Sequence, residues 1–469
     1  MSVQKGLCGR TALFCCGVFN AAQMLYNQKN TIPGVLLCDR VGQHMKTALV
    51  LSGGGAKGAY EAGCIRALQE LGYEFDLVCG TSIGALNGLL VAQKDFDRMY
   101  RMWEELSIEQ VMREPLNLDL SLDSIISQKN LIPSFFRSYV NEKGADIGPL
   151  IDLIHSLYDP QRLRKSGVRY GLVTVAFPDL RPLELEAGAL SDDEVVEYAL
   201  ASASCFPAFP VHKIGEQGFI DGGYYDNLPI SLARRMGAQQ MIVIELEETL
   251  THPVFAGRPN IRLVRPSWGL GGFLDFNRDA LDFRTRLGYL DVMKQFGEYK
   301  GHRYAFSRAD ITDAQAMPFY NAVLDYEEKN SRGKLLAAKE LPLTDYLRAL
   351  AKKDTLSLAD YLLLGAENAM EIFEFSNVEL YDFRDVQDQL LQHFEALYQQ
   401  RAADYNKKLE DIAPSRYLDL LKNINSKEVV GYFYHDMLRG RQINYTNIFI
   451  QGYLLKEYLC ALYFYVQAK

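Results

Sequence analysis

The sequence has no pair of cysteines spaced as in a metal or redox motif. Half of its eight cysteines fall within residues 1–44, and the others are scattered as Cys64, Cys79, Cys205 and Cys460, with no C-x-x-C pair and no histidine spacing suited to zinc. The scattered cysteines are therefore expected to be small buried hydrophobic residues in a reducing compartment. Neither a metal ion nor an organic cofactor is implied.

The sequence also lacks an excess of positive charge. Its 50 lysines and arginines are outnumbered by 59 aspartates and glutamates, which gives a formal net charge of −9. Such a chain is not attracted to a phosphate backbone or to an anionic membrane surface. No nucleic acid is therefore expected as a partner, and any contact with lipid has to be mainly apolar.

Long apolar runs are missing at both ends of the chain. The run at residues 12–14 is too short to span a bilayer, and no clear cleavage site follows it as in an exported protein. The final helix, predicted over Ile448–Val466, carries Lys456 and Glu457 in its middle, where charges are costly in a membrane. We expect this helix to be buried in the protein and the chain to be cytoplasmic, with at most a peripheral contact to a membrane.

Two glycine-rich turns, each between a strand and a helix, organise residues 47–93. An apolar run at residues 48–51 leads into the turn Gly53-Gly54-Gly55-Ala56-Lys57-Gly58, after which a helical pattern follows. A second strand over residues 75–78 breaks at Gly80-Thr81-Ser82-Ile83-Gly84 into an Ala/Leu-rich helix. This organisation is typical of an active site.

The second turn fits the G-x-S-x-G spacing of a nucleophile elbow. A serine in a tight strand-to-helix turn has neighbouring backbone close on both sides, so the residues two before and two after it must lack bulk. Gly80 and Gly84 meet this requirement. Ser82 then lies at a helix N-terminus, where free N–H groups favour developing negative charge.

The first turn is open to two interpretations. Gly53, Gly55 and Gly58 satisfy the G-x-G-x-x-G fingerprint of a dinucleotide site, so a nucleotide-binding module is one alternative. Such a site requires an acid that binds the ribose at the end of the next strand, but Asp76 lies at the start of that strand. The other interpretation is that the glycine N–H groups face an oxyanion formed at Ser82, with positive charge from the nearby lysine of the turn.

A third motif, Asp221-Gly222-Gly223, places an acid at the end of a short apolar strand over residues 218–221. An aspartate before glycine is usually a turn residue, and its position on another strand end is what makes Asp221 a candidate base. Asp226 is the alternative carboxylate. His252 follows in the order Ser, Asp, His of many elbow hydrolases, so a Ser82–Asp221–His252 triad esterase is the rival enzyme.

Together, GGGAKG, GTSIG and the later Asp221-Gly222-Gly223 resemble the patatin-like phospholipase family in its motif order. The resemblance covers residues 45 to about 300. It implies a three-layer α/β fold with a mostly parallel sheet between helices, and a lipid acyl hydrolase with a Ser–Asp dyad that acts on lipid or other acyl esters. By motif it makes Ser82 the nucleophile and Asp221 the base. The oxyanion or anion-binding residues that it implies are Gly53, Gly54, Gly55, Lys57 and Gly58.

Three segments are predicted along the chain. Residues 1–44 form an N-terminal extension outside the fold, since Met45 directly precedes the first strand. Residues 45–305 form the hydrolase domain, with further strands at 168–177, 183–186, 218–221, 241–245 and 261–264. From Asp279 the pattern becomes helical and stays so, which predicts an all-helical C-terminal domain or cap over residues 306–469.

Removal of residues 1–44 is expected to leave the protein folded and active, because the segment contributes no strand or motif to the predicted domain. The melting temperature and the ester hydrolysis of a chain that begins at Met45 should equal those of the full chain. A marked loss of either would mean that the segment packs on the core.

Overall fold

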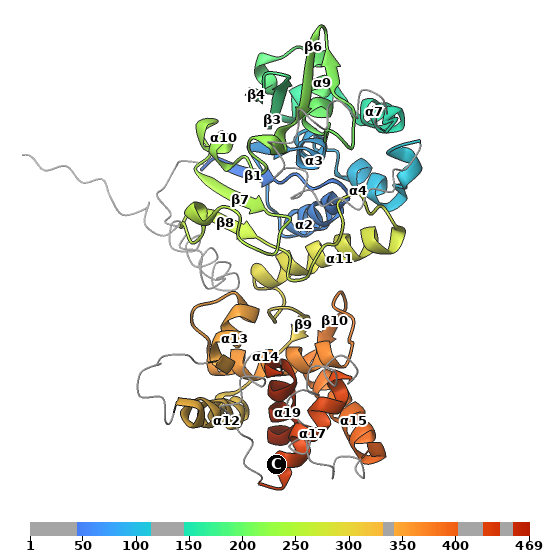
Figure 1. Ribbon diagram of the computed structural model, residues 1–469. Coiled ribbons are helices and arrows are strands. Elements are labelled where there is room, and N and C mark those ends of the chain that lie inside the picture. The colour runs from blue at the N-terminus through green and yellow to red at the C-terminus, as the bar shows by residue number, and fades with distance from the viewer. Residues whose placement is uncertain (1–44, 114–144, 332–341, 402–424, 441–453) are drawn as a thin grey trace, which may run out of the picture. The chain divides into compact units, whose positions relative to one another are not determined.

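An eight-stranded sheet forms the centre of the N-terminal part of the computed structural model (Figure 1), which describes residues 45–113, 145–331, 342–401, 425–440 and 454–469. Its strands are β1 (Thr47–Leu51), β2 (Leu77–Thr81), β3 (Arg169–Phe177), β4 (Arg181–Glu186), β5 (His212–Ile214), β6 (Gln217–Asp221), β7 (Gln240–Ile244) and β8 (Ile261–Val264). They lie in the order β5-β6-β3-β2-β1-β7-β8, with β4 also paired to β3. Strands β3, β2, β1, β7 and β8 are parallel, while β4, β5 and β6 pair in antiparallel fashion.

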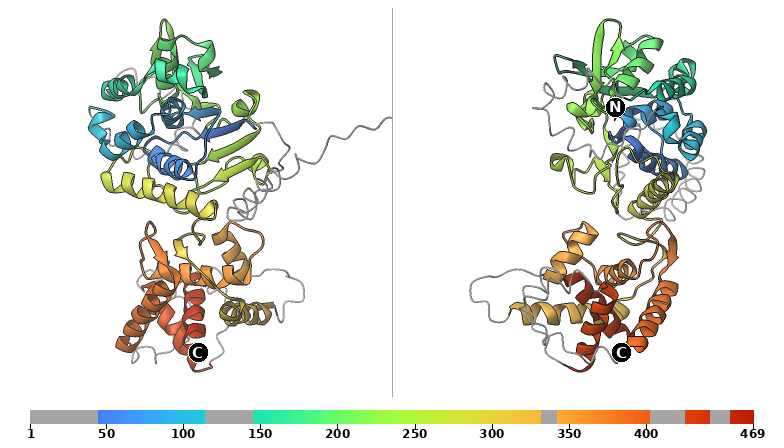
Figure 2. Two further views of the ribbon diagram at one scale, coloured as in Figure 1. Left: turned by 180° about the vertical axis from the view of Figure 1, so that it is seen from behind. Right: turned by 45° about the vertical axis from the view of Figure 1, so that its right-hand side comes forward.

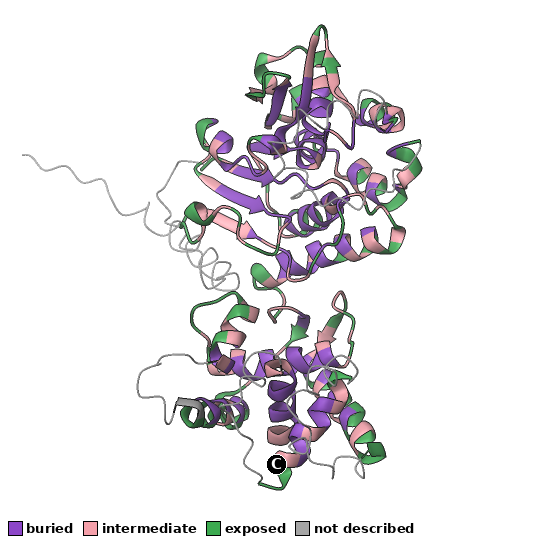
Figure 3. Ribbon diagram, in the orientation of Figure 1, coloured by how far each residue is buried: buried purple, intermediate pink, exposed green. Residues whose placement is uncertain are grey.

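Helices cover both faces of this sheet. They are α2 (Gly58–Glu70), α3 (Ile83–Ala92), α4 (Phe96–Glu105), α7 (Gly148–Leu157), α8 (Pro160–Ser166), α9 (Asp192–Ser202), α10 (Ile230–Arg235) and α11 (Arg278–Gln295). In β1, Leu49 and Leu51 pack into the core with α2, α3 and α11, whereas Ala48 and Val50 pack against α10. Figure 3 shows β1 and β7 buried along their lengths, as expected for parallel strands covered on both faces. The predicted three-layer, mostly parallel α/β fold is therefore confirmed.

Two glycines let α2 and α11 pack almost backbone to backbone. A Cβ on Gly63 would lie 1.8 Å from Thr285 O, and a Cβ on Gly288 would lie 2.1 Å from Tyr60 O. Both views in Figure 2 keep these two helices side by side. Since α2 begins at the glycine-rich turn, its packing on α11 fixes the position of that turn.

The C-terminal part of the chain is helical but contains two short strands. Its helices are α12 (Asp313–Ser331), α13 (Pro342–Ala351), α14 (Leu358–Ile372), α15 (Phe383–Arg401), α17 (Ser426–Leu438) and α19 (Leu455–Gln467). Strands β9 (Ala305–Arg308) and β10 (Leu380–Asp382) pair in parallel with each other. The prediction that residues 306–469 are all-helical is therefore wrong at these strands, which are too short for an alternating pattern to reveal.

Helix α19 lies in a hydrophobic cluster of this C-terminal part, where Tyr458, Leu459 and Phe464 are buried. The predicted burial of the final helix is thus confirmed for residues 455–466, while residues 448–453 lie outside the described part. Within the residues described, no helix is long and apolar enough to cross a bilayer. Residues 1–44 are also outside the description, and the three predicted segment boundaries stay predictions.

Alanine at Gly288 is expected to destabilise the protein. Its methyl group would overlap a backbone carbonyl of α2, and overpacking of this kind costs about 1–3 kcal/mol. The gain of ~1 kcal/mol from replacing glycine by alanine inside a helix offsets only part of this cost. Gly188→Ala is the matched control, because the nearest atom to a Cβ there is 3.9 Å away. Denaturant unfolding of both variants should show a loss at Gly288 alone, and equal stabilities would contradict the close helix packing.

Candidate functional site

Ser82 lies in the turn between β2 and α3 with a strained backbone. Its φ of 54° and ψ of −126° form a combination that residues other than glycine seldom adopt. The Ser82 N–H donates to Ser202 Oγ at 2.9 Å, and Ser202 Oγ donates to Val173 O at 2.6 Å. Because Ser202 is fully buried, this pair of hydrogen bonds holds the strained turn in place.

The glycines on either side of Ser82 are required sterically. A Cβ on Gly80 would lie 2.1 Å from Gly84 O, and a Cβ on Gly84 would lie 2.6 Å from Ser52 O. The elbow therefore folds back on itself and also against the end of β1. The predicted G-x-S-x-G spacing corresponds to these two close approaches.

Asp221 ends β6 and lies beside the elbow. The residue after it, Gly222, packs against the residue before Ser82, since a Cβ on Gly222 would lie 3.0 Å from Thr81 Cγ2 and 2.1 Å from Val173 O. Glycine thus lets the two loops approach. The structure brings together the serine and the aspartate that the motifs singled out.

Burial of Asp221 makes its carboxylate more basic. Its Oδ1 accepts the Gly223 N–H at 2.7 Å, whereas Oδ2 is buried and has no hydrogen bond of ordinary geometry among the described residues. Loss of hydration raises the pKa of Asp221 to about 6, although interactions with the Ser82 side chain and the Gly223 N–H counteract part of the rise. One oxygen of a carboxylate with a raised pKa is therefore positioned to accept a proton.

Only two amides of the glycine-rich turn remain available for an anion. Gly53 donates its N–H to Asn227 O at 3.0 Å. In the part of the chain that the structure describes, the N–H groups of Gly54 and Gly55 donate no hydrogen bond. Gly55, with a φ of 56°, lines the same cavity as Ser82. These two N–H groups are therefore available to bind an anion.

Lys57 and Gly58 are engaged elsewhere. The Lys57 ammonium is 2.6 Å from Glu247 Oε1, so its charge is largely neutralised. The Gly58 N–H donates within the 3-10 turn η1 (Gly55–Lys57). Both residues therefore shape the turn, and neither offers a free donor through these groups.

Asn227 ties the glycine-rich turn to the loop that carries Asp221. Its Nδ2 donates to Gly53 O at 3.1 Å and to Ser52 Oγ at 3.3 Å, in addition to the Gly53 N–H that its carbonyl accepts. Sequence patterns did not reveal this role, because the two partners are more than 170 residues apart.

His252 and Asp226 pair with each other and not with Ser82. His252 Nε2 lies 3.9 Å from Asp226 Oδ1, and His252 Nδ1 lies 2.8 Å from Thr251 Oγ1. Asp226 Oδ1 also accepts the Leu228 N–H at 3.1 Å. Both ring nitrogens of His252 thus face groups other than Ser82 and Asp221.

Asp76 lies at the wrong end of its strand for a dinucleotide site. It directly precedes β2, and its Oδ2 accepts the Thr47 N–H at the start of β1 with a distance of 2.7 Å. The glycine-rich turn follows the opposite end of β1. Asp76 is therefore not at the end of β2, where the fingerprint requires an acid for the ribose.

An apolar cavity opens beside Ser82. The empty space between its walls is about 650 Å³, which includes space open to solvent. Apart from Gly55, Ser82 and Cys205, its walls are apolar or aromatic side chains, namely Ile83, Leu86, Met102, Trp103, Leu106, Val111, Leu150, Leu153, Ile154, Ala203, Phe209, Phe273, Leu274 and Phe276. Such a cavity suits a hydrocarbon chain.

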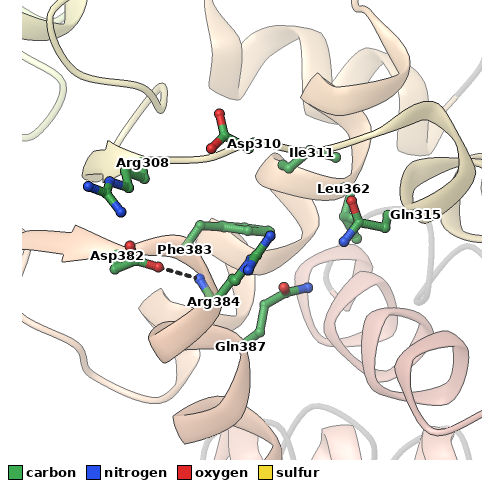
Figure 4. Close-up of a pocket in the computed structure, with 9 residues that line it drawn as sticks. All are labelled: Arg308, Asp310, Ile311, Gln315, Leu362, Asp382, Phe383, Arg384 and Gln387. Atoms are coloured by element: carbon green, nitrogen blue, oxygen red, sulfur yellow. Dashed lines mark hydrogen bonds between the residues drawn. The ribbon is translucent and has the colours of Figure 1, made fainter.

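A more polar cavity of about 560 Å³ lies in the C-terminal part, as Figure 4 shows. Its walls are Arg308, Asp310, Ile311, Gln315, Leu362, Asp382, Phe383, Arg384 and Gln387. No hydroxyl, thiol or imidazole is among them, and Asp382 accepts the backbone N–H of Arg384 at 3.0 Å as a cap of α15. This cavity therefore offers no hydroxyl or thiol nucleophile for attack on an ester.

Two buried polar residues near the elbow could not be identified from sequence motifs. Ser202 is the acceptor for the Ser82 N–H, and Glu61 accepts the Ser52 N–H at 2.8 Å. No motif marks Ser202. An acid between small and apolar residues of α2 is the only sequence signal for Glu61. Over the described ranges, no group of three or more metal-ligating side chains is clustered.

Comparison with known proteins agrees with the motifs. The family model described as "Patatin-like phospholipase" matches residues 49–234. "Patatin-like phospholipase domain-containing protein 7" of Mus musculus is 29% identical over 211 residues, which cover 42% of this chain and 13% of that protein. "Patatin-like phospholipase domain-containing protein 6" of Homo sapiens is 30% identical over 208 residues, with the same two coverages.

The chain thus spans only 13% of the length of these two relatives. Among solved structures, VipD from Legionella pneumophila is similar at 13% identity and a TM-score of 0.38, over 91% of this chain and 90% of that one. The family model covers the segment that contains the glycine-rich turn, Ser82 and Asp221. The chain therefore contains a patatin-like phospholipase domain, which the family model matches over residues 49–234.

Proposed function

We propose that this chain is a lipid acyl hydrolase in which Ser82 is the nucleophile and Asp221 the base. The observation that carries the proposal is the position of Ser82, which lies in a strained turn between a buried carboxylate and an apolar cavity. Strain at a residue held by its surroundings is typical of active sites. The family name supports a phospholipid as the source of the ester.

The Ser82 hydroxyl attacks the ester carbonyl while its proton passes to Asp221 Oδ2. Collapse of the tetrahedral intermediate returns this proton to the leaving alcohol and leaves an acyl-enzyme. A water molecule then repeats both steps, and the fatty acid is released. The cycle uses the two side chains, backbone amides and water, and it requires no cofactor.

The N–H groups of Gly54 and Gly55 stabilise the oxyanion in this proposal. They precede α2, whose N-terminus adds a favourable dipole. Donors that are held in place before the reaction cost no reorganisation when charge develops. Asn227 keeps them in place through its hydrogen bonds to Gly53.

The substrate is an ester with a long acyl chain, because the cavity beside Ser82 is almost entirely apolar. The headgroup side of the ester would face solvent. A cytoplasmic protein in peripheral contact with a membrane would meet such a substrate. Because the chain is acidic, it would make this contact through apolar groups.

The rival triad needs His252 between Ser82 and Asp221. Its imidazole instead lies next to Asp226 and Thr251, so the dyad is favoured. The rival nucleotide-binding function needs a ribose-binding acid at the end of β2, whereas Asp76 lies before the start of that strand and binds the Thr47 N–H. Labelling of Ser82 by a fluorophosphonate would exclude nucleotide binding as the main function.

Ser82→Ala and Asp221→Asn are each expected to lower turnover by orders of magnitude, since each removes a group that reacts directly. His252→Ala should leave turnover within about five-fold, because its ring contacts neither residue of the dyad. Hydrolysis of long-chain phospholipids and p-nitrophenyl esters, with melting curves for each variant, provides the measurement. Loss of activity in folded His252→Ala would establish the triad instead.

Activity should fall as the pH drops through about 6, because protonated Asp221 cannot accept a proton. Stability should move in the opposite direction. Since burial raises the pKa of Asp221 from 3.8, its ionisation costs stability as the pH rises through about 6. Asp221→Asn should therefore melt at the same temperature as the parent near pH 3, below the ordinary pKa of 3.8, and at a higher temperature at pH 8. A lower melting temperature at pH 8 would show that the ionised carboxylate stabilises the fold.

A further inference from the structure

Three helices contribute polar side chains to a buried network behind the glycine-rich turn. Glu61 of α2 accepts the Ser52 N–H through Oε1 at 2.8 Å and Asn87 Nδ2 through Oε2 at 2.9 Å. Asn87 of α3 accepts the Nε1–H of Trp103, from α4, at 2.9 Å. The three side chains are at most 1% exposed. The network links the residue before Gly53 to a wall of the apolar cavity.

The direction of every hydrogen bond in this network is fixed. Indole N–H groups only donate, so the side-chain oxygen of Asn87 must face Trp103. The Asn87 amide nitrogen also donates to Gly58 O at 3.1 Å, which confirms its orientation. Ser52 offers only its backbone N–H to Glu61. Both oxygens of Glu61 must therefore accept, which is the pattern of an ionised carboxylate.

Burial disfavours the ionised form of Glu61, whereas its hydrogen bonds favour that form. Burial raises the pKa of Glu61 to about 8, and the hydrogen bonds from Asn87 and Ser52 offset part of this rise. No charged side chain bonds to Glu61 among the described residues, and Cys64 on the same helix is a buried thiol whose pKa is itself raised. A carboxyl group is thus kept where an apolar residue would pack, which indicates a role beyond packing.

We infer that Glu61 and Asn87 are positioning residues, which keep the backbone of the glycine-rich turn in a fixed position next to Ser82. This inference rests on the proposed function of that turn as the oxyanion site. Glu61 fixes the Ser52 amide, and the next three residues carry the backbone toward Ser82. Asn227 holds the turn from the other side through Gly53. The amides of the turn are therefore anchored from both sides and need no rearrangement during catalysis.

Exchange of the carboxyl group of Glu61 and the amide group of Asn87 tests whether the order of hydrogen-bond donors and acceptors matters. Glu61→Gln places an amide donor against either Ser52 or Asn87, and Asn87→Asp places a second carboxylate against Glu61. In the double variant Glu61→Gln/Asn87→Asp, glutamine accepts from Ser52 and donates to the new aspartate, which accepts from Trp103. The bond to Gly58 O is lost, and an oxygen of the new aspartate faces that carbonyl oxygen instead. The charge moves from one residue to the other while the order of donors and acceptors is restored.

Two readouts at about pH 9, where Glu61 is ionised, separate the possible results. Hydrogen exchange of the Ser52–Gly55 amides does not depend on catalysis, and kcat on a long-chain ester does. Glu61→Gln should speed exchange and lower kcat about ten-fold or more with KM little changed, and the double variant should recover most of both effects. Near pH 6 the parent carries the proton itself, so the difference between parent and Glu61→Gln should shrink.

The inference is overturned if the double variant is no better than Glu61→Gln, or if Glu61→Gln leaves exchange at Ser52–Gly55 unchanged. If Glu61→Gln does not fold, Trp103→Phe decides, because it removes one donor and no charge. That variant should also speed exchange at the turn, and unchanged exchange would refute the network's role. If the parent hydrolyses no ester, the proposed function fails, while the exchange data still decide whether Glu61 positions the turn.

Discussion

The positive φ of Ser82 is the constraint on which the rest of the site depends. This backbone is disfavoured by itself and persists only where the surroundings hold it. Gly80 and Gly84 remove the clashes, and Ser202 supplies a partner for the Ser82 N–H. The same close approaches bring the end of β1, and hence the glycine-rich turn, next to the elbow. One strained residue therefore determines where glycine is needed in the elbow.

Two buried carboxylates near this turn differ in how they are bonded, and the difference matches their proposed roles. Glu61 has both oxygens engaged by donors, which suits a residue that holds backbone in place. Asp221 has one oxygen bonded to Gly223 and one without a hydrogen bond of ordinary geometry among the described residues. A free acceptor with a raised pKa suits proton transfer. Burial thus raises the basicity of Asp221, whereas the hydrogen bonds to both oxygens of Glu61 keep that side chain in a fixed position.

Much of this arrangement could be predicted from local sequence. Strands β1 and β2 are continuous apolar runs because both faces are buried, and the spacing of Gly80 and Gly84 reflects sterics within five residues. The pairing of Ser82 with Asp221 was implied by the resemblance to patatin-like phospholipases. The engagement of Gly53 by Asn227 and of Lys57 by Glu247 could not be predicted, because those partners are distant in sequence. Strands β9 and β10 were missed because three or four residues carry no usable period.

The most direct test is a crystal structure of the protein inactivated with a long-chain alkyl fluorophosphonate. We expect phosphorus bonded to Ser82 Oγ, its phosphoryl oxygen within hydrogen-bond distance of the Gly54 and Gly55 N–H groups, and the alkyl chain in the cavity against Trp103. An adduct at another residue, or one at Ser82 whose oxygen lies away from both glycine amides, would contradict the proposed dyad and oxyanion site.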